Sequence, residues 1–378
     1  MPQTKGKPDG DKKQTFLCFS VTFLPLSRIG LKSLNLLSMR NIFQFGETVP
    51  GYSIPVLNER EIRAGAGILS PLMPWDYGGE VNVLSERGRA LWPAWIEAIG
   101  QSSAIDPEYR SCGMLALSLP DRDRSLAWCR THSWRAEETP AWLDNLLGKG
   151  PDGLWLPDIA QVRNPRLAKA LIEACLAAGV RLLVDTNASR WDIQGNTIRS
   201  LETNKGKLIA DHYVISAGAW SRQLLSGTIG DVDIRPVRGQ ILLFQAKPGL
   251  LPCILYKAGR YLVPRQDGLI LAGSTLEHAG FDKSTTQAAR DELLAFALNV
   301  LPPLRKAPLV RQWAGLRPGS TDNIPTISVH PRLDNLYINS GQYRYGVTMA
   351  PASAEILRDV MMHRVPTIDP TPYRWLSR

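Results

Sequence analysis

The pattern of apolar and polar positions is clearest over residues 164–184. Apolar side chains recur there at the spacing of one helix face. Asn164 is placed to cap this helix and Gly179 to end it. The run VRLLV, residues 180–184, then predicts a buried strand. A helix followed by a buried strand is the repeating step of a doubly wound α/β sheet.

Two later segments fit the same sheet. The run 213–216 predicts a strand, and the small residues Ala217 and Gly218 follow it. Small residues at the carboxyl end of a strand let a ligand approach the backbone, and open α/β sheets bind ligands at that edge. Residues 336–341 predict another strand, and we expect a helix from Pro351 to Met362.

Elsewhere some segments have helical spacing and others are strand-like. Residues 82–99 have helical spacing, although Pro93 predicts a kink or a break. Closely spaced strand-like runs with short turns predict an antiparallel sheet, and they cover residues 236–246, 253–257, 260–265 and 269–275. A helix over 285–301 follows, and the chain then returns with the segment 311–320. The fold class is therefore α/β, with one domain of separated segments and an antiparallel sheet able to cover its ligand.

Composition and charge argue against several classes of protein function. The formal charge is +9, but residues 1–63 hold nine basic and five acidic residues, and the remaining excess is scattered. Because no basic stripe results, we expect no nucleic-acid partner. Five cysteines without C-x-x-C and five histidines without a close pair argue against a disulfide framework and a metal site. The basic start and apolar run 16–26 resemble a signal peptide, but Pro25 interrupts the run, so we expect a cytoplasmic protein without a stable membrane anchor.

Seven motifs then occur in an order that carries a family resemblance. They are AGAGILSPLMPW, VRNPRLAKAL, VISAGAWS, PVRGQ, YLVPRQDGLILAGSTLEHAGFD, WAGLRPGSTDNIPTI and GQYRYGVTMAPASAEIL. Together they resemble the FAD-dependent oxidoreductases of the D-amino acid oxidase type, and within that family the glycine oxidases of thiamine biosynthesis. The resemblance covers about residues 51–365.

The resemblance implies two domains. A Rossmann-like FAD-binding domain would comprise residues 51–85, 155–235 and 311–378. An antiparallel-sheet domain for the substrate would comprise residues 86–154 and 236–310.

Four side chains are implied at the substrate. Arg317 in GLRPGS would clamp an amino acid carboxylate, because a guanidinium offers two parallel donors to it. Arg344 would lie near the flavin and help to hold the substrate. Tyr261 would line the cavity with its hydroxyl near the carboxylate, and Leu276 would contact the substrate. Arg317, Arg344 and Tyr261 are thus the implied catalytic residues.

The resemblance also implies where FAD binds. Asn58 or Glu59, after a short apolar strand, would hold the ribose, and the sequence leaves this choice open. The other implied FAD contacts are Gly65, Gly67, Ile68, Leu69, Ala188, Ala217, Gly218, Gln342, Tyr343, Arg344, Tyr345, Gly346, Val347 and Thr348.

The implied reaction is oxidation of glycine or another small amine. Hydride passes from the α-carbon to FAD, the imine is hydrolysed, and oxygen accepts the electrons as hydrogen peroxide. Two alternatives stay open, namely a D-amino acid dehydrogenase with a quinone acceptor and a non-catalytic remnant without FAD. A homo-oligomer is a further expectation.

The chain departs from the family at its start. A first strand followed by G-x-G-x-x-G should precede residue 51, but Gly30 and Gly46 stand alone there. We therefore expect residues 1–50 to be an atypical segment, either disordered or read out of frame, with a diverged but genuine terminus as the alternative. The central strand of the sheet should then be missing or improvised, which would weaken FAD binding.

Overall fold

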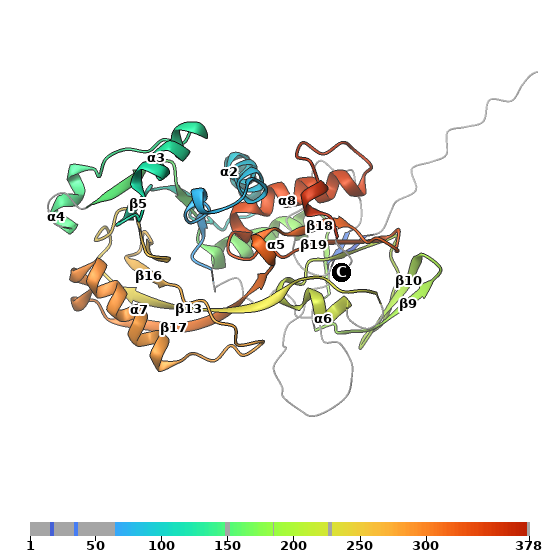
Figure 1. Ribbon diagram of the computed structural model, residues 1–378. Helices are drawn as coiled ribbons and strands as arrows, with labels where there is room; N and C mark the ends of the chain where they lie inside the picture. The colour runs from blue at the N-terminus through green and yellow to red at the C-terminus, as the bar shows by residue number, and fades with distance from the viewer. Residues whose placement is uncertain are drawn as a thin grey trace, which may run out of the picture.

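The computed structural model describes residues 16–18, 34–36 and 65–375, except 148–151, 184 and 226–228. The two candidate ribose ligands, Asn58 and Glu59, lie outside the described residues. The prediction for residues 1–50 also lies outside them, apart from two short strands. Figure 1 shows two principal sheets with helices packed around them.

The first sheet has six strands in the order β18-β19-β12-β1-β2-β8. They are β18 Thr326–Val329, β19 Leu336–Ser340, β12 His212–Ile215, β1 Phe16–Cys18, β2 Leu34–Leu36 and β8 Arg181–Leu182. All neighbours run parallel except β18 and β19, which are antiparallel. β1 therefore occupies the central position next to β12 with only three residues, so the expected improvised strand comes from the N-terminal segment itself.

The helix and strand expected over 164–184 differ in detail. α5 spans Asn164–Ala177, and Gly179 follows it at φ +82°, a conformation that favours glycine. Asn164 does not cap the helix, because it is the first helical residue and Arg163 is the N-cap. Among the described residues 180–183, Arg181 and Leu182 alone join the sheet as β8, and Arg181 is exposed. The prediction of a buried strand over this segment was therefore wrong, since β8 is a short edge strand.

The second sheet has seven strands in the order β17-β13-β16-β15-β14-β5-β6. They are β17 Leu309–Gly319, β13 Arg235–Gln245, β16 Leu269–Gly273, β15 Arg260–Pro264, β14 Ile254–Lys257, β5 Met114–Leu117 and β6 Gly153–Leu156. β13, β16, β15 and β14 pair antiparallel in this order, as the sequence predicts, and β17 adds a further antiparallel partner to β13. β14 and β5 are parallel.

Side chains alternate between the two faces of this sheet. Leu242 and Phe244 cluster with Leu293 of α7, which spans Gln287–Val300 and covers the outer face (Figure 1). On the inner face, Ile241 and Tyr261 join a cluster that also includes residues of α8. The inner face thus lies between the two sheets, where a ligand shared by both would bind.

Two long helices, α2 Gly79–Gly100 and α8 Gly346–Met361, pack against each other. A Cβ atom at Gly88 would come within 2.0 Å of the Thr348 carbonyl oxygen, so the close approach requires glycine. Pro93 lies inside α2, which the structure assigns as one uninterrupted helix, so the predicted break is wrong.

α8 begins at Gly346, five residues before the predicted start at Pro351. A proline cannot donate the hydrogen bond that would reach Val347, four residues earlier. The Trp92 indole nitrogen donates to the Val347 carbonyl instead, at 3.1 Å. This tertiary contact satisfies the carbonyl that Pro351 leaves free, so the helix continues through the proline.

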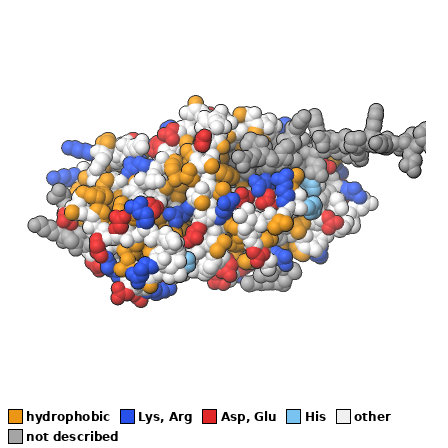
Figure 2. Space-filling model, turned by 90° about the horizontal axis from the view of Figure 1, so that it is seen from above, with side chains coloured by type: hydrophobic (Ala, Val, Ile, Leu, Met, Phe, Trp, Pro, Cys, Tyr) orange, Lys and Arg blue, Asp and Glu red, His pale blue; other side chains and the backbone are white. Residues whose placement is uncertain are grey.

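The remaining elements are shorter. Two three-stranded sheets contain β3 Ile68–Leu69, β7 Ala160–Gln161 and β4 Arg110–Ser111, and β11 Gly206–Leu208, β10 Thr197–Thr203 and β9 Ala188–Gln194. The helices α3, α4 and α6 span Arg122–Thr131, Asp144–Leu147 and Ser221–Leu225. On the face in Figure 2, basic and acidic side chains are interspersed, in keeping with the scattered charge of the sequence.

Candidate active site

Arg317 lies near the end of β17, on the inner face of the seven-stranded sheet. It pairs with Val237 of β13, and its guanidinium leans over Gly239, two residues farther along that strand. A Cβ atom at Gly239 would lie 2.2 Å from both terminal nitrogens of Arg317. The glycine therefore makes the space in which the guanidinium rests on the sheet.

A second glycine does the same for Tyr261. Tyr261 of β15 pairs with Gly273 of β16, and a Cβ atom at Gly273 would lie 2.8–2.9 Å from the phenol ring and its oxygen. Tyr261 is 7% exposed. Two glycines on one sheet face thus seat the two side chains predicted to hold a carboxylate.

Neutral groups hold Arg317 in place. One terminal nitrogen donates to the Ser274 hydroxyl at 2.7 Å, and the other donates to the Thr275 carbonyl at 3.2 Å. Burial lowers the pKa of Arg317, and the Arg344 charge lowers it further. No ion pair identified among the described residues involves Arg317, so its charge has no fixed counter-ion there.

Arg344 and Leu276 line one pocket of about 510 Å³. Leu276 is 48% exposed, and Ser274 and Thr275 also line this pocket. The Ser274–Leu276 segment therefore connects Arg317 on one side with Arg344 on the other. Burial lowers the pKa of Arg344, but the surrounding tyrosines outweigh it and the net pKa is raised.

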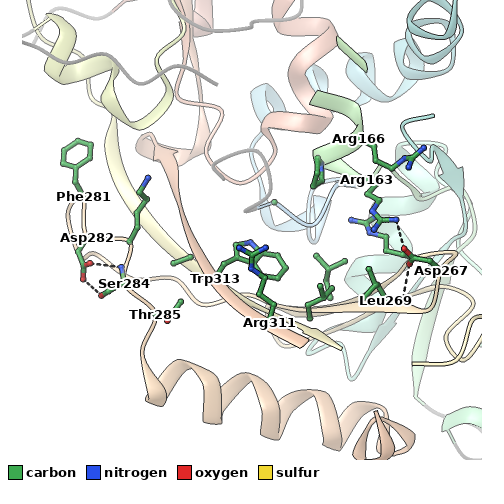
Figure 3. Close-up of a pocket in the computed structure, with 17 residues that line it drawn as sticks. Arg163, Arg166, Asp267, Leu269, Phe281, Asp282, Ser284, Thr285, Arg311 and Trp313 are labelled. Carbon is green, nitrogen blue, oxygen red and sulfur yellow. Dashed lines mark hydrogen bonds and ion pairs between the residues drawn. The ribbon is translucent and has the colours of Figure 1, made fainter. Parts of the chain in front are cut away.

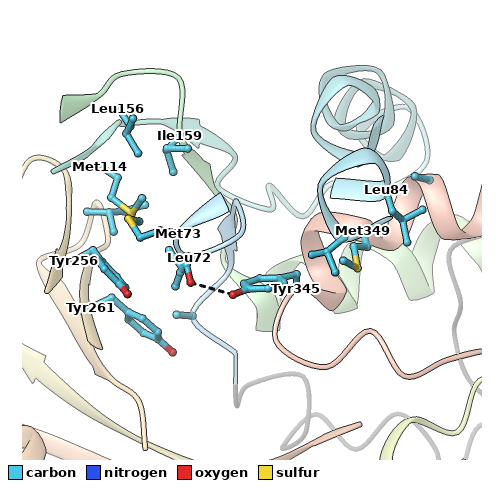
Figure 4. Packing of buried hydrophobic residues seen from close by; sticks show 14 of the residues in the cluster. Leu72, Met73, Leu84, Met114, Leu156, Ile159, Tyr256, Tyr261, Tyr345 and Met349 are labelled. Carbon is cyan, nitrogen blue, oxygen red and sulfur yellow. Dashed lines mark hydrogen bonds between the residues drawn. The ribbon is translucent and has the colours of Figure 1, made fainter. Parts of the chain in front are cut away.

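Tyrosines enclose the rest of the inner face. Figure 4 shows Tyr256 and Tyr261 on the strands and Tyr345 opposite them, with its hydroxyl directed at the Leu72 carbonyl. Tyr345 donates to that carbonyl at 3.1 Å and also contacts the Tyr77 hydroxyl. Burial raises the pKa of Tyr345 well above its ordinary value, so the phenol stays neutral.

The carboxyl edge of the parallel sheet has features of a nucleotide site. Ser216 follows β12 and Asn339 lies in β19; the Ser216 Oγ and Asn339 Nδ2 atoms are buried and have no hydrogen-bond partner among the described residues. Ala217 is buried, while Gly218 has φ +54° and open space where a Cβ would point. Unpaired buried polar atoms beside an open glycine fit a polar ligand at this edge.

The loop 342–345 and the start of α8 adjoin this edge. Gln342 contacts Asn339, and the Tyr343 amide donates to the Pro318 carbonyl at 3.1 Å, which ties the loop to the end of β17. Tyr345 is the N-cap of α8, and Gly346, Val347 and Thr348 form its first turn. A first helical turn presents free amides to a ligand.

Other predicted FAD contacts lie in packed positions. Gly67 has φ +74°, and a Cβ atom there would lie 2.0 Å from the Val162 carbonyl oxygen. Gly65 packs against the Asn164 amide in the same way. Ile68 and Leu69 form β3, and Leu69 is fully buried in a hydrophobic cluster. This turn is therefore shaped on one side by its contact with the start of α5.

Ala188 is the first residue of β9 and is buried with Trp191 and Tyr213. This position is part of a hydrophobic core, and a contact between Ala188 and adenine stays a prediction.

A larger cavity of about 1040 Å³ opens on the same sheet, with Arg163, Arg311, Asp267 and Trp313 around it (Figure 3). Arg163 forms an ion pair with Asp267 at 2.8 Å. Arg265, also at its wall, donates to the Ala66 and Val162 carbonyls, and burial lowers its pKa to about 10. This arginine fixes the turn of Gly65 and Gly67 beside the cavity.

The described residues contain no group of three or more potential metal ligands, and none of their helices is long and apolar enough to cross a membrane.

Sequence reasoning missed four residues of this site, namely Gly239, Gly273, Ser274 and Thr275. Glycines inside the strand-like runs PVRGQILLFQA and LILAGST were a usable signal, because an interior strand glycine often marks a close approach. The two partners of Arg317 had no such signal, since only the folded chain brings residues 274, 275 and 317 together.

Comparison with known proteins gives consistent matches. The DAO family, described as FAD dependent oxidoreductase, matches residues 60–360. The glycine oxidase of Pseudomonas aeruginosa is 38% identical over 316 residues, which is 82% of this chain and 87% of that protein. The glycine oxidase of Pseudomonas putida is 40% identical over 317 residues, with the same coverage.

A solved structure supports the fold. Glycine oxidase from Geobacillus kaustophilus superimposes with a TM-score of 0.82 at 22% identity, covering 97% of this chain and 98% of that one. At this identity the match shows the fold alone, and it confirms the predicted α/β class. The domain boundaries stay a prediction. β17 begins at Leu309 and belongs to the seven-stranded sheet, although its residues from 311 onward were expected in the FAD-binding domain.

Proposed function

We propose that this chain, which belongs to the DAO family of FAD-dependent oxidoreductases, oxidises glycine or another small amino acid or amine. Its electron acceptor would be oxygen, giving hydrogen peroxide, and its product would enter the thiazole part of thiamine. Similarity to the Pseudomonas glycine oxidases supports the substrate class.

The observation that carries the proposal is Arg317. Its guanidinium rests on Gly239, is held by neutral acceptors, and has no ion-pair partner identified among the described residues. A partly buried cation held in one orientation is suited to bind a carboxylate through two hydrogen bonds. A guanidinium has five N–H groups, and Arg317 donates two of them to Ser274 and Thr275, so donors remain for a ligand.

The neighbouring residues would orient the amine. The Tyr261 hydroxyl would donate to the same carboxylate, and Arg344 would add positive charge from the opposite wall. Leu276 would limit the size of the side chain. Holding the α-carbon in one position accounts for much of the catalysis, because orientation replaces a bimolecular encounter.

The described residues fit FAD at the sheet edge. Ser216 and Asn339 would supply their unpaired polar atoms, Gly218 would admit the nucleotide, and Gly346–Thr348 would offer amides at the start of α8. FAD, when bound, accepts the hydride from the α-carbon. The turn expected to hold the pyrophosphate falls between β1 and β2, where Gly30 is the only glycine.

The direct test measures flavin and turnover together. The purified protein should show a flavin spectrum after addition of FAD, and it should release peroxide with glycine, sarcosine or D-alanine. Flavin-loaded protein that oxidises none of the three would disprove the substrate class. Dye reduction without peroxide would instead favour a quinone acceptor, and failure to bind FAD would indicate a non-catalytic remnant.

A substitution tests the role of Arg317. Arg317→Met should raise KM for glycine by about a hundredfold, the loss expected for a charge-assisted bidentate contact. Arg311→Met is the matched control, because Arg311 is an exposed arginine on the same strand. Equal effects of the two variants would contradict the assignment.

A further inference from the structure

Ser274 and Thr275, in the segment between β16 and α7, hold Arg317, and contacts with β13 hold that segment in turn. β16 ends at Gly273, and residues 274–277 continue beside β13 without regular pairing. Arg238 and Glu277 exchange two backbone hydrogen bonds there, at 2.8 and 3.0 Å. These bonds fix the far end of the segment that carries Ser274 and Thr275.

The side chains of the same two residues form an ion pair in which Arg238 is buried and Glu277 is partly exposed. Arg238 is 7% exposed and donates to one carboxylate oxygen of Glu277, from Nε at 3.0 Å and from a terminal nitrogen at 2.6 Å. Its other terminal nitrogen donates to Asp282 at 2.6 Å. A buried guanidinium that loses such partners is costly, so this contact strongly restrains the segment.

The second oxygen of Glu277 extends the restraint toward Arg317. It accepts from the Thr275 hydroxyl and from the Gln240 side chain at 2.9 Å. The Thr275 hydroxyl in turn accepts a hydrogen bond from the backbone N–H of Gln240 at 2.9 Å, and the Thr275 carbonyl accepts one from Arg317. A continuous chain of hydrogen bonds thus runs from Arg238 through Glu277 and Thr275 to Arg317.

The two arginines lie on opposite faces of the sheet. Arg317 pairs with Val237, and Arg238 is the next residue, so its side chain points to the outer face. Gln240, on the same face as Arg238, bonds to Thr286 at the start of α7. Arg238 therefore reaches the substrate region only through the segment 274–277.

We propose that the Arg238–Glu277 ion pair is a positioning device that sets the orientation of Arg317 and thereby the affinity for a substrate carboxylate. The inference rests on the proposed role of Arg317. Neither Arg238 nor Glu277 touches the substrate; they act by holding the Ser274 hydroxyl and the Thr275 carbonyl against the guanidinium.

The test compares substrates with and without a carboxylate. Arg238→Gln and Glu277→Gln should each raise KM for glycine by about tenfold, with kcat changed much less, because a misplaced donor weakens ground-state binding of the carboxylate. KM for ethylamine, which has no carboxylate, should stay unchanged. Arg238→Lys should restore part of the glycine affinity, and Arg122→Gln, which breaks the exposed Arg122–Glu138 pair, should leave both values alone.

Two further measurements separate this inference from its premise. Titration of acetate into the FAD-loaded protein, followed by the flavin spectrum, should show the same loss of affinity without turnover. Crystal structures of the Arg238→Gln and Glu277→Gln variants should show Arg317 displaced from Ser274 and Thr275.

The contrary outcomes are distinct. Equal losses for glycine and ethylamine, or Arg317 in its original position in both variant structures, would overturn the positioning role. Wild-type protein that oxidises no amine would remove the proposed function, while the position of Arg317 in the variant structures would still decide whether the ion pair orients it.

Discussion

At the scale of single residues, the site depends on two glycines as much as on the side chains expected to bind the substrate. Because Gly239 and Gly273 have no side chains, space remains above the sheet at these two positions. Arg317 occupies the first and Tyr261 the second. The resemblance could name Arg317 and Tyr261, because each lies in a recognisable motif. It could not show how they are seated, because that depends on pairing between strands far apart in sequence.

Gly239→Ala should therefore damage binding more than stability. The new methyl group would meet the far end of the Arg317 side chain, which can be displaced without disturbing the backbone. We expect KM for glycine to rise about tenfold or more and the thermal unfolding midpoint to change little. Kinetics and a thermal melt would check this, with Gly79→Ala as the control, since nothing lies within 4 Å of a Cβ there. An unchanged KM would mean that Arg317 does not need its place over Gly239.

At the scale of elements, most helices and strands were predictable, and two of the errors involve prolines. Pro93 predicts a kink or a break and Pro351 the start of a helix, yet both lie inside helices. The hydrogen bond from Trp92 to Val347 compensates for Pro351, and it joins residues 255 positions apart. Local propensity is outweighed here by packing between α2 and α8, which no window of sequence contains.

Gly88→Ala tests that packing. The added Cβ would lie 2.0 Å from the Thr348 carbonyl, which is backbone and cannot swing aside, so α2 and α8 must separate. We expect destabilisation by about 1–3 kcal/mol in chemical unfolding. Gly100→Ala, at the open end of the same helix, should instead be neutral or stabilise by up to about 1 kcal/mol. Similar effects of both substitutions would show that helix propensity, not the contact, determines the result.

At the scale of the whole molecule, the two sheets were predictable in kind but not in extent. The close spacing of the strand-like runs predicts antiparallel strands over 236–275, and these pair as expected. The parallel sheet was harder to predict, because β1 and β2 have three residues each and no glycine motif between them. Their pairing identifies them as strands, β1 with β12 and β2 with β1 and β8.

Acid should destabilise the whole fold through His330. Its Nδ1 accepts from the Arg332 and Leu333 amides at 3.0 and 3.1 Å, so the ring is neutral and Nε2 donates to the Ile229 carbonyl at 2.8 Å. Burial lowers the pKa of His330 below its unfolded value. Because the unfolded chain then binds more protons, this contribution is complete above about pH 6.5 and is lost as pH falls below it.

Chemical unfolding at pH 7.5 and at pH 5.5 would measure this effect. His330→Gln should be less stable at pH 7.5 but should lose less stability on acidification than the wild-type protein. A variant with the same pH dependence as the wild type would assign the acid sensitivity to other groups.

The strand order of the parallel sheet has a consequence for biosynthesis. β1 and β2 are synthesised before their neighbours β12 and β8, which follow more than 140 residues later. In a nascent chain β1 and β2 can pair with each other, but the other edge of each strand stays unpaired until β8 and β12 have been synthesised. During that interval these segments are candidates for chaperone binding, so the yield of folded protein should respond to the rate of translation between them.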